Sequence, residues 1–152
     1  MRVEPSLPKD VSGPLSSLLY VSHVAIGSDQ LLNELTDILT ASMARNTALD
    51  ITGLLIVTPR YFTQLMEGAL SALEFVMSSI EADSRHTDIE MVLKGPLQKR
   101  IGGAWRLVRF EAGSFEERHV TPLLERCHAD HSTENVAALM AFIRQLLQNS
   151  RD

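Results

Sequence analysis

Apolar and polar positions along the first half of the chain follow two different spacings. Residues 18–23 are strand-like, whereas apolar side chains from Gly27 to about Ala44 recur every three or four positions, which predicts an amphipathic helix. Residues 51–57 are apolar and rich in branched side chains, as expected for a buried central strand. A Pro-Arg turn then leads into a second strand over 61–66, so these two strands are predicted to form a hairpin.

The second half of the chain continues with further helical and strand-like segments. Ser71 and Glu74 have the spacing of a capping box, which predicts the start of a second helix. Two more strands are predicted over 89–93 and 105–110. The chain then ends in two predicted helices, one running from a capping box at Ser114 and Glu117 to about Cys127 and one capped by Ser132.

The resulting order of elements, β-α-β-β-α-β, matches the ferredoxin-like pattern. We therefore predict an α+β fold with a fifth strand and two C-terminal helices. Two helices would cover one face of the sheet, and the C-terminal pair is available for the other face. We expect residues 1–16 to be a flexible N-terminal arm, 17–111 the folded domain and 112–152 a C-terminal helical extension. The pattern alone indicates no function, because folds of this type host many.

Composition and charge narrow the class of protein. The chain has 152 residues, of which 45% are hydrophobic and 22% charged, as in an ordinary globular domain. Its net charge of −5 and the lack of a long Lys/Arg run argue against direct nucleic-acid binding. No apolar run is long enough to span a membrane, and no signal peptide is recognisable. Cys127 is the only cysteine, which excludes an internal disulfide and fits a cytoplasmic location.

The predicted last helix carries an apolar stripe that needs a partner. The stripe can either pack on the open face of the sheet or mediate association between chains. Because an exposed stripe of that size would be a liability, we expect a homo-oligomer, most simply a dimer. The residues that form the stripe are Val136, Leu139, Met140, Ile143, Leu146 and Leu147.

Four short segments carry a more specific signal. In order and spacing they resemble the BLUF family, sensors of blue light using FAD, over roughly residues 17 to 110. The second and third segments together are quite specific, whereas either alone would be weak. The segments are Leu-Leu-Tyr-Val-Ser-His at 18–23, Ala-Arg-Asn-Thr-Ala-Leu-Asp-Ile-Thr-Gly-Leu-Leu at 44–55, Phe-Thr-Gln-Leu-Met-Glu-Gly at 62–68 and Asp-Ser-Arg-His at 83–86.

The resemblance implies roles for individual residues, with residues 17–111 as the flavin-binding domain. Tyr20 matches the tyrosine that donates an electron, together with a proton, to the excited flavin, and Gln64 matches the glutamine between that tyrosine and the ring. Asn46 matches the asparagine that hydrogen-bonds the polar edge of the isoalloxazine, and Arg45 a polar or basic neighbour of the ring. A cluster near the flavin and its ribityl-phosphate chain is matched by Arg85 and His86.

The resemblance also suggests a route by which the signal leaves the flavin. Trp105 matches a semi-conserved tryptophan on the fifth strand. Two residues later the family commonly has methionine, where this chain has Leu107, so the usual signal relay through these positions is open to question. The implied cofactor is non-covalent FAD, with FMN possible. The implied function is a photoreceptor, not an enzyme, that signals to an unidentified downstream protein.

Each of these residues also has an ordinary structural explanation. Taken singly, Tyr20, Asn46 and Gln64 would more often be a half-buried strand tyrosine, a helix-exit residue and a cross-strand polar residue. Their joint spacing favours the photoreceptor. For the Arg85-His86 pair and for Trp105, the structural and functional explanations are equally weighted. Cys127, His128, Asp130 and His131 resemble a metal site in composition, but no second Cys/His group accompanies them, so we expect no metal.

Two other functions are considered beside the photoreceptor. The first is a BLUF-like scaffold that no longer responds to light and only binds partner proteins, for which Leu107 is a mild argument. The second is an enzyme such as a flavin-dependent reductase. The sequence contains no nicotinamide-binding fingerprint and no evident substrate base, so the enzyme is disfavoured.

Overall fold

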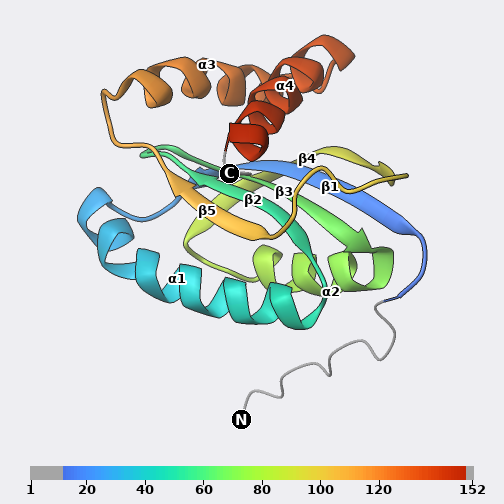
Figure 1. Ribbon diagram of the computed structural model, residues 1–152. Coiled ribbons are helices and arrows are strands. Elements are labelled where there is room, and N and C mark those ends of the chain that lie inside the picture. The colour runs from blue at the N-terminus through green and yellow to red at the C-terminus, as the bar shows by residue number, and fades with distance from the viewer. Residues whose placement is uncertain (1–11, 150–152) are drawn as a thin grey trace.

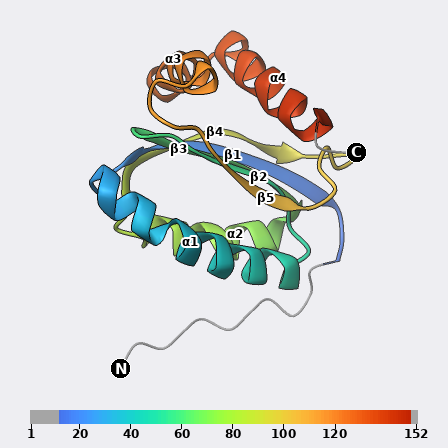
Figure 2. The ribbon, with the colours of Figure 1, turned by 60° about the vertical axis from the view of Figure 1, so that its left-hand side comes forward.

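The computed structural model describes residues 12–149. A five-stranded sheet lies between two helical layers, with α1 and α2 on one face and α3 and α4 on the other (Figures 1 and 2). The elements are β1 (Leu15–Val24), α1 (Ser28–Ala48), β2 (Thr52–Val57), β3 (Tyr61–Ala69), α2 (Leu70–Glu81), β4 (His86–Pro96), β5 (Trp105–Arg109), α3 (Phe115–Ala129) and α4 (Thr133–Asn149).

The predicted ferredoxin-like α+β fold is confirmed. The strand order is β4-β1-β3-β2-β5, and every neighbouring pair is antiparallel except β2 and β5, which are parallel. The fifth strand extends the ferredoxin-like sheet at the edge beside β2, and the two C-terminal helices follow it. Residues 1–11 of the expected N-terminal arm lie outside the described residues, and β1 already begins at Leu15.

Several predicted boundaries are wrong. Strand β4 spans His86–Pro96, three residues beyond each end of the predicted 89–93, and β1 begins at Leu15 rather than Leu18, because both strands pair with each other over this longer range. The first helix continues to Ala48 rather than ending near Ala44, because its last turns bury the polar side chain of Asn46, which an apolar pattern does not reveal. Strand β3 runs to Ala69 instead of Met66, since its ladder with β1 extends that far. Ala69 is therefore the N-cap of α2, without a side-chain cap, and the predicted capping box of Ser71 and Glu74 does not start the helix.

The predicted caps of the two C-terminal helices are confirmed. The backbone N–H of Glu117 donates to Oγ of Ser114 at 3.1 Å. The carboxylate of Glu117 accepts from the backbone N–H of Gly113 at 3.0 Å, one residue earlier than in a standard capping box. At the next helix, the backbone N–H of Asn135 donates to Oγ of Ser132 at 3.2 Å. Both hydroxyls satisfy donors that a helix start leaves unpaired.

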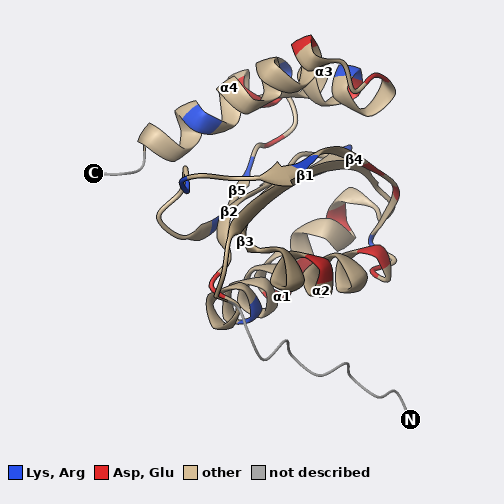
Figure 3. Cartoon of the chain, turned by 90° about the vertical axis from the view of Figure 1, so that its right-hand side faces the viewer, with Lys and Arg blue, Asp and Glu red and all other residues tan. Residues whose placement is uncertain are grey.

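The central strands separate two hydrophobic cores. One core lies between the sheet and α1 and α2, and the other between the sheet and α3 and α4. The central strands β1, β2 and β3 are almost free of Lys, Arg, Asp and Glu, whereas β4, β5, the helices and the loops carry charged side chains (Figure 3).

The stripe on α4 packs within its own chain. Leu139 and Ile143 are buried in the core between the sheet and α3 and α4. The homo-oligomer expected from an exposed stripe therefore has no support from this helix. No helix among residues 12–149 is long and apolar enough to cross a bilayer.

Candidate functional site

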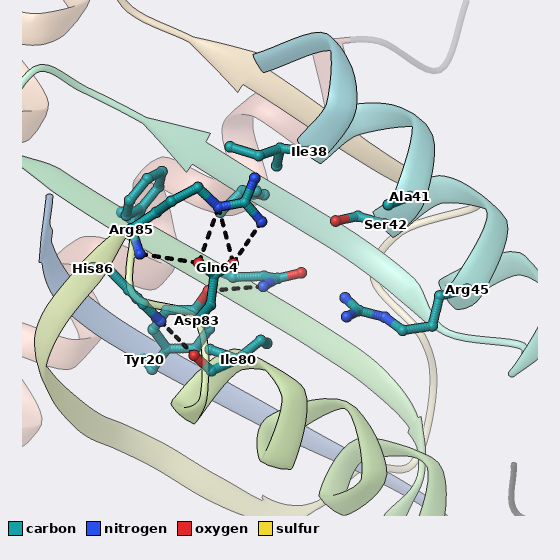
Figure 4. Close-up of a pocket in the computed structure, with 12 residues that line it drawn as sticks. Tyr20, Ile38, Ala41, Ser42, Arg45, Gln64, Ile80, Asp83, Arg85 and His86 are labelled. Atoms are coloured by element: carbon teal, nitrogen blue, oxygen red, sulfur yellow. Dashed lines mark hydrogen bonds and ion pairs between the residues drawn. The ribbon is translucent and has the colours of Figure 1, made fainter. Parts of the chain in front are cut away.

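A cavity lies between the sheet and the helices α1 and α2. Its walls combine apolar side chains with polar residues that the sequence singled out (Figure 4). Asn46 is not among the lining residues, but it follows the lining residue Arg45 on α1. Side chains from α1 face those of the central strands across the cavity, and the segment after α2 closes one end. The lining residues are Tyr20, Ile38, Ala41, Ser42, Arg45, Leu55, Phe62, Gln64, Ile80, Asp83, Arg85 and His86.

A chain of hydrogen bonds runs through the strands beside this cavity. Tyr20 on β1 lies directly opposite Gln64 on β3, and the Gln64 Nε2 donates to the Tyr20 Oη at 2.9 Å. On its other side, the indole Nε1 of Trp105 on β5 donates to the Gln64 Oε1 at 2.9 Å. An indole N–H can only donate, so this bond fixes the amide with its oxygen towards Trp105 and its NH₂ towards Tyr20. All three side chains are buried.

The phenol of Tyr20 is held in its protonated form. Burial raises its pKa well above the ordinary range, and the nearby carboxylate of Asp83 adds to this effect. The hydrogen bond from Gln64 and the positive charge of Arg45 oppose the rise but do not cancel it. Tyr20 therefore keeps its proton on Oη throughout the neutral range.

Asn46 presents an unsatisfied donor next to Arg45, which lines the cavity. Its side chain is 0% exposed, and its Nδ2 has no hydrogen-bond partner among the described residues. The Oδ1 accepts from Nε of Arg45 at 3.2 Å, and burial lowers the pKa of that guanidinium. Buried donors are normally paired, so a free amide N–H at this position fits a ligand that presents an acceptor, such as the carbonyl edge of an isoalloxazine ring. By this criterion the residues fit a flavin.

Arg85 is tied to a carboxylate that the sequence analysis did not single out. Asp83 accepts from the Arg85 backbone N–H and from its Nε and Nη2, the last at 2.6 Å. Glu34 on α1 lies 3.8 Å from Nη1. Burial acts to raise the pKa of Asp83, but the hydrogen bonds and charge of Arg85 outweigh it and hold the pKa below its usual range. The bond to Asp83 in turn raises the pKa of Arg85.

His86 uses both ring nitrogens within the protein. Its Nε2 lies 2.6 Å from the carbonyl oxygen of Ile80 and donates to it, and its Nδ1 lies 2.7 Å from the Ser22 hydroxyl. The ring stands edge-on to the rings of Tyr20 and Phe62. His86 thereby connects β1 to the end of α2 and forms a fixed wall of the cavity.

Two other predicted groups lie apart from this network. Leu107 is half-buried opposite Leu55 and packs against the same core as Trp105. The four C-terminal residues of metal-like composition do not converge: Cys127 donates to the carbonyl of Asn135, His128 stacks on His23, and His131 lies near Glu90. Within residues 12–149 there is no group of three or more His, Cys, Asp or Glu side chains that could hold a metal ion.

Some lining residues were missed by sequence reasoning. Asp83 was included in the segment at 83–86 but was given no role, although it lies two residues before Arg85 and hence within reach of a local ion pair. Ile38, Ser42 and Arg45 recur at intervals of four and three, which places them on one face of α1. That helical spacing could have identified the wall of the cavity from the sequence.

Comparisons with known proteins identify the family of the chain. The family model described as "Sensors of blue-light using FAD" matches residues 15–108. The photoactivated adenylate cyclase subunit beta of Euglena longa is 33% identical over 104 residues, which is 68% of this chain but 12% of that protein. The blue light- and temperature-regulated antirepressor BluF of Escherichia coli is 29% identical over 91 residues, 59% of this chain and 22% of that protein.

Solved structures give the same family. The dark state of BlrB, a BLUF protein, superposes with a TM-score of 0.70 at 34% identity and covers 88% of this chain and 98% of that one. BlsA in its photo-activated state has the same fold, with a TM-score of 0.70 at 21% identity over 86% of this chain. The chain spans only a small part of the curated relatives, but the family model covers most of its length. The chain belongs to the BLUF family of blue-light sensors that use FAD.

Proposed function

We propose that this chain is a blue-light photoreceptor that binds FAD non-covalently and passes its signal to a separate protein. The hydrogen-bond chain from Trp105 through Gln64 to Tyr20 carries this proposal. In it a single amide, beside a cavity, accepts from a buried indole N–H and donates to a buried phenol oxygen. The unpaired Nδ2 of Asn46 supplies the donor that a flavin edge would need.

A bound flavin would supply blue-light absorption and, once excited, an electron acceptor. Ile38 and the other apolar side chains of α1 and α2 would hold the faces of the ring, and Asn46 and Arg45 its polar edge. Tyr20 would give up one electron and the proton on its Oη to the excited ring and then take both back, which leaves the flavin oxidised and only the hydrogen bonding of Gln64 changed. Arg85 would lie near the ribityl-phosphate chain, while His86 would keep the wall beside Tyr20 in place.

Gln64 would convert this transfer into a change of hydrogen bonding. Its Nε2 donates to Tyr20 and its Oε1 accepts from Trp105, so rotation or tautomerisation of the amide alters both bonds together. After a rotation, two N–H donors would face each other at Trp105, which cannot accept. The change would thus reach β5, where Trp105 and Leu107 are the proposed relay, and would bias a partner-binding surface.

The proposal assigns no catalytic step to residues 12–149. A photoactivated adenylate cyclase and a light-regulated antirepressor among the relatives support an effector protein as the recipient of the signal. That recipient is unidentified. The scaffold that does not respond to light is the competing function, and Leu107 in place of the family's usual methionine favours it mildly.

One experiment separates these functions. Purified protein is freed of cofactor, titrated separately with FAD and FMN, and then illuminated with blue light while its absorption spectrum is recorded. We expect FAD to bind, a small red shift of the flavin absorption in light, and recovery in the dark. A protein that binds neither flavin would support the scaffold. A protein that binds only FMN would refute the assignment of FAD.

A further inference from the structure

Glu67 is the only Asp, Glu, Lys or Arg among the residues of β1, β2 and β3. Its side chain is 0% exposed, and none of the ion pairs formed by residues 12–149 includes it. A buried carboxylate is costly unless other groups donate hydrogen bonds to it. The proposed photochemistry does not use Glu67, so its burial calls for another explanation.

Three donors converge on this carboxylate. Oε1 accepts from the Thr52 hydroxyl at 2.9 Å and from the backbone N–H of Gly102 at 3.1 Å. Oε2 accepts from the backbone N–H of Ile101 at 2.7 Å. Two consecutive backbone N–H groups aimed at one carboxylate form a small anion-binding nest. Glu67 therefore holds the loop between β4 and β5, which lies 34 residues further along the chain.

This loop connects the two faces of the sheet. Glu67 and Gln64 lie an odd number of positions apart on β3, so their side chains point to opposite faces. On the face of Glu67, a Cβ at Gly102 would lie 3.6 Å from the Glu67 Oε1 and 3.5 Å from a methyl carbon of Leu147 on α4. Three residues after Gly102, the indole of Trp105 reaches Gln64 on the cavity face.

We propose that Glu67 is a positioning residue that clamps the β4–β5 loop through the N–H groups of Ile101 and Gly102. The clamp keeps Trp105 in the orientation that donates to Gln64 and keeps the loop against α4. Its consequence for light signalling rests on the proposed function. Its effect on Trp105 does not, because the hydrogen bonds that form the clamp are all within the protein.

The single tryptophan of the chain provides the test without any cofactor. In Glu67→Gln, one carboxylate oxygen is replaced by an NH₂ group that faces an N–H donor, so one anchor of the loop is lost. For the flavin-free variant we expect the Trp105 emission to shift to longer wavelength and its quenching by acrylamide to increase. The matched control is Asp50→Asn, which removes an exposed carboxylate from the same cluster, where it pairs with Arg100 but touches neither loop N–H. We expect no change in that variant.

A second measurement covers the case in which Glu67→Gln does not fold. In the unmodified chain, the amide hydrogens of Ile101 and Gly102 should exchange at least about tenfold more slowly than that of the exposed neighbour Gly103, the factor expected for about one net hydrogen bond. Exchange as fast as at Gly103 would overturn the clamp. So would a folded Glu67→Gln variant with unchanged Trp105 emission and quenching. If the unmodified, flavin-loaded chain showed no light response although its Trp105 emission and quenching behaved as expected, that result would instead contradict the proposed function.

Discussion

Replacing Asn46 by Leu should have opposite effects on the flavin-free protein and on flavin binding. The Asn46 side chain is fully buried, and its Nδ2 has no partner within the described residues. A buried unpaired donor destabilises the protein by about 1–3 kcal/mol. Leu has nearly the same shape without polar atoms, so the substitution removes this cost as well as the hydrogen bond from Arg45.

The expected magnitudes follow from these contacts. Loss of the bond from the charged Arg45 costs about 1.5 kcal/mol, and the better helix propensity of Leu returns about 0.5 kcal/mol. We therefore expect the flavin-free variant to be about as stable as the parent or up to about 2 kcal/mol more stable. Flavin binding should weaken by about 1.5–3 kcal/mol, which is about 10- to 150-fold in Kd, because a buried acceptor of the flavin would lose its donor.

The two quantities are measured by urea unfolding of the flavin-free chain and by flavin titration. Thr47→Leu is the matched control, since it places Leu at the neighbouring exposed position of α1 and should leave flavin affinity unchanged. The reasoning is refuted if Asn46→Leu binds flavin as tightly as the parent. It is also refuted if the flavin-free variant loses several kcal/mol, as a fully satisfied buried Asn would.

Two further predictions concern stability. Gly53 has φ of 143°, and a Cβ there would overlap the carbonyl oxygen of Leu65, so Gly53→Ala should lower the free energy of unfolding by at least about 2 kcal/mol in urea titrations; a loss below about 0.5 kcal/mol would contradict this close approach. Because the pKa of Tyr20 is raised in the folded state, the contribution of Tyr20 to the free energy of unfolding is fully present below the ordinary tyrosine pKa of about 10 and declines above it. Above about pH 10, the free energy of unfolding of the parent should thus fall by up to about 1.4 kcal/mol per pH unit relative to that of Tyr20→Phe. If the two proteins gave parallel curves of unfolding free energy against pH, the raised pKa of Tyr20 would be excluded.

The fold could be predicted because its signals are local. Apolar spacing and a two-residue turn placed the hairpin of β2 and β3, and the caps at Ser114 and Ser132 were read correctly from side chains that act on their own helix. The boundaries that failed depend on partners elsewhere. The end of β3 is set by pairing with β1, and the last turn of α1 buries a polar residue.

The site could be predicted only in part for the same reason. Tyr20, Asn46 and Gln64 were identified by their spacing as a motif, yet the direction of the Gln64 amide depends on Trp105, 41 residues away. The hydrogen bond between His86 and Ser22 and the two from the β4–β5 loop to the Glu67 carboxylate join segments that only the folded chain brings together. No pattern in a single sequence contains these distances.

The central claim is tested most directly by comparing the two tyrosines of the chain. Tyr20 lies opposite Gln64 at the cavity, whereas Tyr61 is buried in the core on the other face of the sheet. Light-minus-dark absorption spectra of flavin-loaded Tyr20→Phe and Tyr61→Phe should differ: we predict that both bind flavin, that Tyr61→Phe keeps the reversible red shift, and that Tyr20→Phe loses it. A normal red shift in Tyr20→Phe would contradict the account.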